Sequence, residues 1–279
     1  MPHLGREVDV DAFWRDGFTI VRNVYSPEEV EELRQACRAG GGASSGDLLA
    51  RPNLRRVLTD GVMIEIAQKV LGRDDIVYAG DSSFTINSTG RGWHKDNADR
   101  VDPNAPDWRS PYTQLRFGIY LQDHKFHSGG LNVRVGSHNK PTNQEGKIVS
   151  VRSGIGDVGV WSMRITHSAN SDLLRFPPFG STDPATAETA PPKPWKLFPK
   201  NDERIAVFAA LGLDDDHGRR YTDYLKTRTY MVNLWRNGPY TPEAIAEAEA
   251  AGLTVRDIPA EVKDDATAGQ NAEWAPIPY

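Results

Sequence analysis

The stretch "TQLRFGIYL", residues 113–121, decides the fold class because two kinds of side chain alternate along it. Successive residues of a β-strand point to opposite faces of a sheet. One face would be mostly apolar, with Thr113, Leu115, Phe117, Ile119 and Leu121, and the other would carry Gln114, Arg116, Gly118 and Tyr120. This alternation predicts a strand with an apolar face in a core and a more polar face on its other side.

Runs of similar character lie on both sides of this segment, separated by Gly, Asn, Asp and Pro. They cover residues 75–80, 82–87, 130–136, 147–152, 156–168 and 203–212. Short strands at this spacing are typical of an antiparallel sandwich or barrel. The chain therefore has an all-β core, and the segments before and after it differ in character.

Helices are predicted on either side of this core. Residues 8–25 indicate a short helix followed by a strand, and Ser26 with Pro27 is typical of a helix start. Further helices are expected over 61–72 and 242–252. Two long segments, 97–112 and 169–202, lack a clear pattern, and loops of this length are often functional lids.

Length and composition favour a single domain. The 279 residues divide into a helical part of about 1–75, a core of about 76–235 and a C-terminal extension of about 236–279. The net charge of −5 gives nucleic-acid binding no global electrostatic support. The single cysteine, Cys37, excludes an intrachain disulfide, and we expect it to be buried on a helix. We expect no signal peptide, no membrane span, a cytoplasmic location and a monomer or homodimer.

His94 and Asp96 form an H-x-D pair in "GRGWHKDNAD", residues 90–99. At a strand end, residues two apart point to the same side and can offer an imidazole nitrogen and a carboxylate oxygen to one metal ion. His167 ends an apolar strand far downstream, and a jelly roll pairs such distant strands. Two His and one carboxylate form the facial triad of non-haem Fe(II), whereas zinc more often takes other sets. The alternatives are that His94 and Asp96 lie at a solvated strand end and that His167 is a core histidine capped by a backbone carbonyl.

Four other histidines fit a metal site less well. His124 and His127 lie in a hairpin segment, His138 follows a Gly-Ser turn, and His217 lies in "DDDHGRR". We predict that all four are surface residues.

Four motifs, in order, resemble the phytanoyl-CoA dioxygenase-like family of Fe(II)/2-oxoglutarate oxygenases. They are "DAFWRDGFTIVRNVYSPEEVEELR" (11–34), "GWHKD" (92–96), "SGGLNVRVGSHN" (128–139) and "GDVGVWSMRITHSA" (156–169). The resemblance covers most of residues 10–235. It implies a double-stranded β-helix (cupin-like jelly roll) with flanking helices, Fe(II) and 2-oxoglutarate as cofactors, O₂ as co-substrate, and His94, Asp96 and His167 as catalytic metal ligands. Arg134-Val135 departs from the family, which usually has an apolar residue and proline there.

The resemblance also implies a basic residue that pairs with the far carboxylate of 2-oxoglutarate. It normally opens the strand after the distal histidine, so Arg204 is predicted, and Arg175 is the alternative. A guanidinium can hold a carboxylate through two parallel hydrogen bonds. If the polar strand faces line the barrel, Gln114 and Asn132 would contact 2-oxoglutarate or substrate.

The expected reaction is hydroxylation, or desaturation or cyclisation, of a small molecule in bacterial specialised metabolism. The carboxylate of Asp96 argues against a halogenase, whose site resembles this one but has Gly or Ala there. Arg116 and Arg134 would need an anionic partner if they faced the interior, which suggests an anionic substrate; pairing with acids on an outer face is the alternative. Arg116, Trp93, Arg100 and Trp108 are the candidate substrate residues, the last two in a lid over 97–112.

Two other functions fit the same residues. One is a cupin-type metalloenzyme that uses no 2-oxoglutarate, for which loss of Arg204 would be harmless. The other is a non-catalytic protein that binds a small ligand on the same scaffold.

Overall fold

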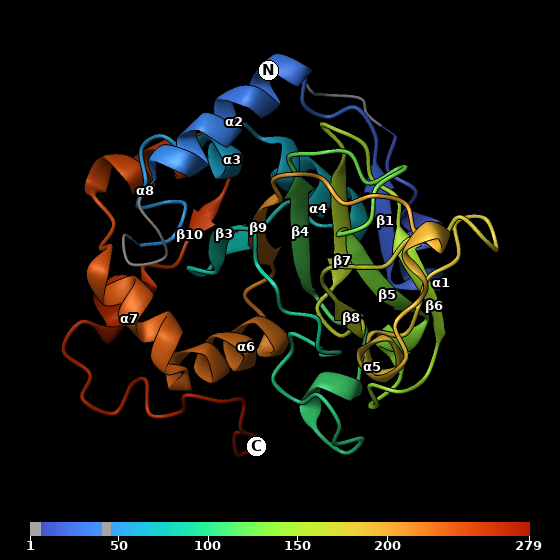
Figure 1. Ribbon diagram of the computed structural model, residues 1–279. Coiled ribbons are helices and arrows are strands. Elements are labelled where there is room, and N and C mark those ends of the chain that lie inside the picture. Colours follow the sequence, from blue (N-terminus) through green and yellow to red (C-terminus); the bar gives the residue numbers. More distant parts are fainter. Residues whose placement is uncertain (1–6, 41–45) are drawn as a thin grey trace.

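The computed structural model describes residues 7–40 and 46–279, and two β-sheets form the centre of the described chain (Figure 1). The larger sheet has the strand order β1-β7-β4-β9-β2-β10, with β3 also paired to β9, and the smaller has the order β6-β5-β8. The strands are β1 (Phe18–Val21), β2 (Val77–Tyr78), β3 (Ser82–Ile86), β4 (Gln114–Tyr120), β5 (Leu131–Val135), β6 (Lys147–Val151), β7 (Val158–Ser162), β8 (His167–Ser168), β9 (Ile205–Gly212) and β10 (Thr254–Val255). Every named pair is antiparallel except β2–β10. The predicted sheet core with flanking helices is confirmed.

Helices from the N-terminal part cover one face of the larger sheet. The α-helices of the described chain are α1 (Val10–Asp16), α2 (Pro27–Ala39), α3 (Arg56–Thr59), α4 (Val62–Leu71), α5 (Pro184–Thr189), α6 (Asp216–Thr227), α7 (Thr229–Asn237), α8 (Pro242–Ala250) and α9 (Ile258–Val262). Phe13 of α1, Leu33 of α2 and Ile66 of α4 lie in one buried cluster with Leu115 and Phe117 of β4. The apolar face predicted for residues 113–121 therefore packs against helices.

The predicted helix boundaries follow from local capping. The Ser26 hydroxyl accepts a hydrogen bond from the backbone N–H of Glu29, whose side chain accepts one from the Ser26 N–H, so α2 begins with a capping box. Cys37 is buried on this helix, as expected. The helices predicted over 61–72 and 242–252 are present as α4 and α8. None of the helices in the described part of the chain is long and apolar enough to cross a membrane.

A second buried layer lies between the two sheets. Tyr120 of β4, Trp161 of β7 and Leu131 of β5 belong to one cluster that joins both sheets. Gly118 lies opposite Gly159 on β7, and a Cβ on Gly118 would lie 2.7 Å from the Trp161 ring. The glycine therefore gives the indole its place on the inner face of the larger sheet.

The segment 169–202 covers the smaller sheet. Its Asp183 accepts hydrogen bonds from Arg134 of β5 and from Trp93, and its Ser181 hydroxyl donates to Asn132 of β5. The proline-rich segment is thus packed against the outer face of β5. It contains α5, on the right of Figure 1.

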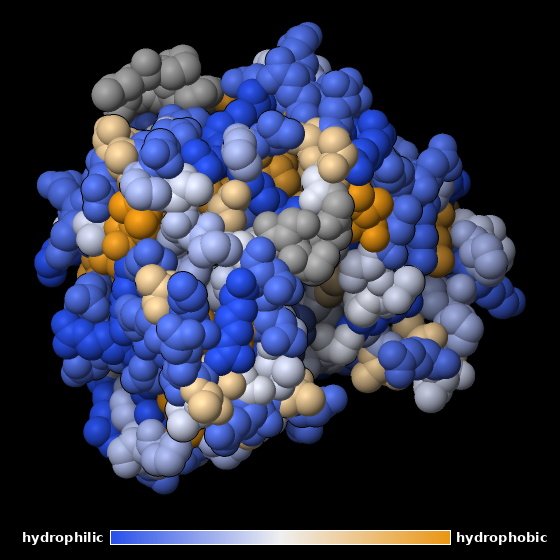
Figure 2. Space-filling view, turned by 90° about the vertical axis from the view of Figure 1, so that its left-hand side faces the viewer, coloured by the Kyte–Doolittle hydropathy of each residue, from blue (hydrophilic) through white to orange (hydrophobic). Residues whose placement is uncertain are grey.

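The structure also departs from the predicted elements. Residues 156–168 form two strands, β7 and β8, because the chain turns at 163–166. Helices α6 and α7 lie at the end of the range assigned to the β core, and β1 and β10 add strands to the larger sheet from outside that range. The face on the side of α7 and α8 is predominantly hydrophilic, with hydrophobic residues scattered over it (Figure 2).

Candidate metal centre

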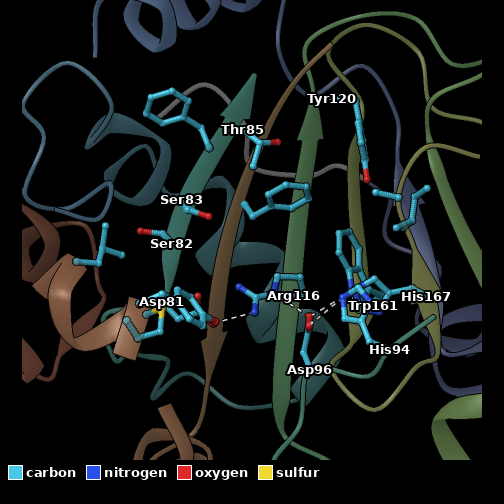
Figure 3. A pocket seen from close by; sticks show the side chains of 17 residues that line it. Asp81, Ser82, Ser83, Thr85, His94, Asp96, Arg116, Tyr120, Trp161 and His167 are labelled. Carbon is cyan, nitrogen blue, oxygen red and sulfur yellow. Dashed lines mark hydrogen bonds and ion pairs between the residues drawn. The ribbon is translucent and has the colours of Figure 1, made fainter. Parts of the chain in front are cut away.

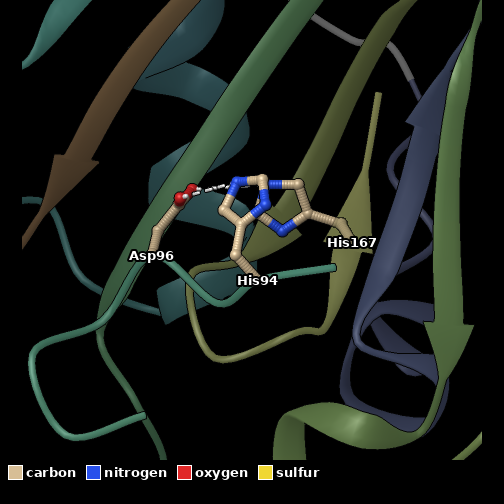
Figure 4. Close-up of side chains that lie close together, drawn as sticks. All are labelled: His94, Asp96 and His167. Carbon is tan, nitrogen blue, oxygen red and sulfur yellow. Dashed lines mark ion pairs between the residues drawn. The ribbon is translucent and has the colours of Figure 1, made fainter. Parts of the chain in front are cut away.

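His94, Asp96 and His167 come together at one end of the space between the sheets (Figure 4). One ligand atom from each residue lies within 4.8 Å of the others. Backbone pairing holds them there: the His94 N–H donates to the His167 carbonyl at 3.0 Å, the His167 N–H donates to the His94 carbonyl at 2.9 Å, and the Asp96 N–H donates to Met163 at 2.9 Å. The two segments predicted to supply ligands are therefore antiparallel neighbours.

Backbone carbonyls set the orientation of both imidazoles. Nδ1 of His94 lies 2.9 Å from the Gly92 carbonyl oxygen, and Nδ1 of His167 lies 3.1 Å from that of Ile165. A carbonyl can only accept, so each Nδ1 carries the proton, and each Nε2 keeps its lone pair for a metal. Both Nε2 atoms lie 3.7 Å from a different oxygen of Asp96. Burial lowers the pKa of His167 to about 4, which keeps this ring neutral.

A chain of charges runs from Asp96 into the cavity wall (Figure 3). Arg116 Nε donates to Asp96 Oδ2 at 3.1 Å, and Arg116 Nη2 lies 2.8 Å from Asp81 Oδ2. Burial alone would raise the pKa of Asp96, but the charge of Arg116 and the adjacent imidazoles lower it below the ordinary value. Tyr221 accepts from Arg116 at 3.2 Å and donates to Asp81 at 2.5 Å. Asp96 is therefore ionised and held in place.

The triad opens into a cavity of about 420 Å³ between the sheets and α7. Most of its wall is apolar, and its residues are Asp81, Ser82, Ser83, Phe84, Thr85, His94, Asp96, Arg116, Tyr120, Leu131, Trp161, His167, Ala169, Phe208, Tyr230, Met231 and Leu234. The volume lies in the range of small-molecule sites. The triad is therefore placed where it can act on a bound small molecule.

Arg204 lies beside the cavity, with one donor unused. Its Nε donates to the Gly129 carbonyl at 2.6 Å, and its guanidinium lies 5.4 Å from the ring centre of Tyr120. Arg204 Nη2 and the Tyr120 hydroxyl are both buried with no hydrogen-bond partner. Buried polar groups are normally satisfied, so this pair indicates a place for a missing acceptor such as a carboxylate. Arg175, the alternative, is exposed.

Neither Gln114 nor Asn132 reaches the cavity. Gln114 donates to the Leu213 carbonyl at 3.0 Å, and a Cβ on Gly212 would collide with its amide. Asn132 is fully buried and accepts from Ser181 in the segment that covers the smaller sheet. On β5 the residue that lines the cavity is Leu131, so here the apolar face is the inner one, contrary to the polar-face premise.

Three candidate substrate residues also lie away from the cavity wall. Trp93 donates to Asp183 at 2.8 Å, Arg100 donates to Tyr224 at 3.1 Å, and Trp108 donates to the Asp99 carbonyl at 2.5 Å. The predicted lid 97–112 contains both buried and exposed residues. Its buried Asp99 accepts two hydrogen bonds from Arg220 of α6, at 2.7 and 2.6 Å. The segment is bonded to α6 and not to the rim of the cavity.

Arg116 does line the cavity, but its charge is already paired. Asp81 and Asp96 flank its guanidinium, and Arg134 pairs with Asp183 at 2.9 Å. The prediction of an anionic substrate therefore loses its basis, since neither arginine needs a ligand to balance its charge.

Three of the four histidines predicted to be on the surface are buried. His124, His138 and His217 are 2%, 1% and 7% exposed, and His127 is partly exposed. Each buried ring has a polar neighbour: His124 lies beside Gln122, His138 beside the Trp14 carbonyl and His217 beside Ser110. None of the three belongs to the metal cluster found among the described residues.

Sequence reasoning missed Asp81, Tyr120 and Trp161. Tyr120 lies on the strand face that carries Arg116, so alternation alone would have placed it in the cavity. Asp81 directly precedes β3 and Trp161 lies on β7, and the pairing of these strands was not evident before the fold was known.

A search for related proteins finds a partial match among curated sequences. No protein-family model matches the chain. The chain is 28% identical over 152 residues to an ectoine dioxygenase of Stutzerimonas stutzeri. The match covers 46% of this chain and 49% of that enzyme, so the chain spans about half the length of the relative it matches.

Solved structures share the fold over most of the chain. Apo HygX from Streptomyces hygroscopicus aligns with a TM-score of 0.55 at 15% identity, over 76% of this chain and 88% of HygX. AviO1 from Streptomyces viridochromogenes aligns with a TM-score of 0.52 at 17% identity, over 77% of this chain and 97% of AviO1. SnoN, a non-haem α-ketoglutarate-dependent epimerase of nogalamycin biosynthesis, aligns with a TM-score of 0.51 at 17% identity, over 73% of this chain and 80% of SnoN. The resemblance to non-haem iron, 2-oxoglutarate-dependent enzymes is thus confirmed at the level of fold.

Proposed function

We propose that this protein is an Fe(II)/2-oxoglutarate-dependent oxygenase of the phytanoyl-CoA dioxygenase-like family, built on a jelly roll. The observation that carries the proposal is the convergence of His94, Asp96 and His167, with ligand atoms within 4.8 Å of one another. Two imidazoles and one carboxylate are the facial set typical of non-haem Fe(II).

The surroundings of the triad fit a metal that reacts with an external substrate. Two backbone carbonyls hold the imidazoles, and Arg116 holds Oδ2 of Asp96, so the ligands are oriented before a metal binds. When bound, Fe(II) with 2-oxoglutarate and O₂ supplies oxidising power sufficient for an unactivated C–H bond. The protein contributes ligand orientation and an apolar cavity that excludes water.

Arg204 and Tyr120 would hold the far carboxylate of 2-oxoglutarate. Both have a buried donor with no partner, and no acidic side chain of the described chain pairs with Arg204. HygX has been solved with nickel and 2-oxoglutarate bound, and its fold aligns with this chain at a TM-score of 0.52 and 15% identity. The same pair of ligands would occupy the equivalent space here.

The reaction we propose is hydroxylation of a small molecule, or a desaturation or ring closure that begins in the same way. Asp96 supports this choice, because its carboxylate fills the position that a halogenase would leave to a halide ion. The cavity of about 420 Å³ sets the size of the substrate. The curated relative is named a dioxygenase, which is consistent with this class.

Binding measurements and turnover together test the proposal. Ni(II), which does not support turnover, should bind at one site per chain and should make 2-oxoglutarate binding measurable by calorimetry. His94→Ala should abolish nickel binding, whereas His127→Ala, which alters a partly exposed histidine outside the triad, should not. Fe(II)-dependent formation of succinate in air would then establish the activity. Equal nickel binding by the two variants would refute the assignment of the site.

A further inference from the structure

We infer that the substrate of the proposed oxygenase is an electrically neutral and largely apolar small molecule. This inference rests on the proposed function and concerns the same cavity. It follows from the charges in the cavity wall, the groups needed for turnover, and the surface left for a substrate.

The acidic and basic side chains of the described wall form a closed set. They are Asp81, His94, Asp96, Arg116 and His167. Arg116 is within 2.8 Å of Asp81 and 3.1 Å of Asp96, and its side chain is only 13% exposed. Both histidines point toward Asp96 and would be occupied by the metal. Each charged side chain of the wall is therefore already engaged by another charged side chain or is placed to bind the metal.

The metal, Arg204 and 2-oxoglutarate bring the charges of the loaded site into balance. A divalent metal and two arginines, Arg116 and Arg204, bring four positive charges. Asp81, Asp96 and the two carboxylates of 2-oxoglutarate bring four negative ones. A charged substrate would add an uncompensated charge to a site of low polarity, where burial of such a charge is costly.

The remaining wall is suited to an apolar body with one or two polar groups. Phe84, Leu131, Phe208 and Leu234 provide apolar surface on several sides, and Tyr230 is 57% exposed. Thr85 Oγ1 is buried in the wall without a hydrogen-bond partner. Figure 3 shows Thr85 and Ser83 pointing into the space across from the triad. A hydroxyl or carbonyl of a neutral substrate would satisfy Thr85.

Matched probes that share one aromatic body and carry a neutral, an anionic or a cationic group test this inference. We would titrate protein saturated with Ni(II) and 2-oxoglutarate with 2-naphthalenemethanol, 2-naphthoate and 2-naphthylmethylammonium. A smaller set of benzyl alcohol, benzoate and benzylammonium would follow. Calorimetry gives the affinities without turnover. We expect the alcohol of at least one set to bind at least about tenfold more tightly than both of its charged partners.

A pair of variants tests whether the charge balance is the cause. Asp81→Asn removes one negative charge from the closed set with little change of shape, so the ratio of carboxylate to alcohol affinity should rise about tenfold. Asp183→Asn is the matched control, since it removes the carboxylate that pairs with Arg134 outside the cavity. In Asp183→Asn the ratio of carboxylate to alcohol affinity should stay at the wild-type value.

The two proposals fail in different ways. Absence of nickel or 2-oxoglutarate binding refutes the proposed function. If the loaded protein binds a charged probe as tightly as its alcohol, or binds neither alcohol, the neutral-substrate inference is overturned while the proposed function stands. The wild-type comparison decides this even if Asp81→Asn does not fold.

Discussion

Replacement of Arg204 by leucine should weaken 2-oxoglutarate binding while leaving the metal site intact. Arg204 is 7% exposed, its Nε is fixed by the Gly129 carbonyl at 2.6 Å, and its Nη2 has no partner. Arg204 is not one of the three candidate metal ligands, so the affinity for nickel should be retained. The guanidinium is thus held by one bond and offers Nη2 to a ligand.

The size of the effect follows from the bonds lost. A hydrogen bond to a charged group contributes about 1.5–3 kcal/mol. Loss of that contribution would weaken 2-oxoglutarate binding by roughly ten- to hundredfold. Arg204→Lys should lie between wild type and leucine, because an ammonium keeps the charge but cannot form two parallel bonds with a carboxylate. Leucine also leaves the Gly129 carbonyl without its donor, which costs about 1–3 kcal/mol of folding free energy.

Calorimetric titration of 2-oxoglutarate into nickel-loaded protein measures this change. Arg175→Leu is the matched control, because Arg175 is exposed and follows the same distal histidine in sequence. The affinity of Arg175→Leu for 2-oxoglutarate should equal that of the wild type. If Arg204→Leu binds 2-oxoglutarate normally while Arg175→Leu does not, the assignment of the carboxylate site is wrong.

Three further changes test other parts of the structure. Arg116→Leu removes the ion-pair partner of Asp81 and Asp96 and should lower the free energy of unfolding of the metal-free protein by about 3–5 kcal/mol, measured in urea. His124 is buried and its pKa is lowered to about 4, so its contribution to stability is complete above pH 6.5 and is lost as the pH falls to 4; His124→Gln should remove roughly 3 kcal/mol of this acid sensitivity. Arg220→Leu should speed proteolysis within residues 97–112, because it removes both hydrogen bonds to Asp99.

Each of these changes has its own control. Arg134→Leu breaks a single, partly exposed ion pair and should cost less than Arg116→Leu. His127→Gln alters a partly exposed ring, so the acid sensitivity should persist. Equal losses for the two arginine variants, or an unchanged pH profile in His124→Gln, would contradict the reasoning. Unchanged cleavage in Arg220→Leu would show that other contacts hold the segment.

Local patterns predicted the elements whose sequence reflects their own geometry. Ser26 with Pro27 located the start of α2, and alternation located β4 and its apolar face. Helix α6 was not predicted because its buried face mixes Tyr221 and Tyr224 with His217 and Thr222, which does not resemble an apolar helical stripe. The apolar residues of α7, Met231, Val232, Leu234 and Trp235, were overlooked in the sequence.

The buried histidines were misjudged for a related reason. Residues near a turn are usually exposed, but His124 is buried by contacts with distant residues, and its Nε2 accepts from the Gln122 amide at 2.9 Å. A neutral imidazole with both nitrogens satisfied can be buried at little cost. Sequence position near a turn therefore does not establish exposure.

Alternation shows that a strand has two kinds of face but not which neighbour covers each. On β4 the polar face turned inward because Arg116 finds Asp81 and Asp96 there. On β5 the polar face turned outward, since Asp183 of the covering segment pairs with Arg134. In both strands the arginine went to the side where a carboxylate lies within about 3 Å, because a buried guanidinium without a partner is costly. In these two strands, the face that turns inward thus depends on where the carboxylates that pair with the strand's arginine lie. Those carboxylates come from other segments of the chain.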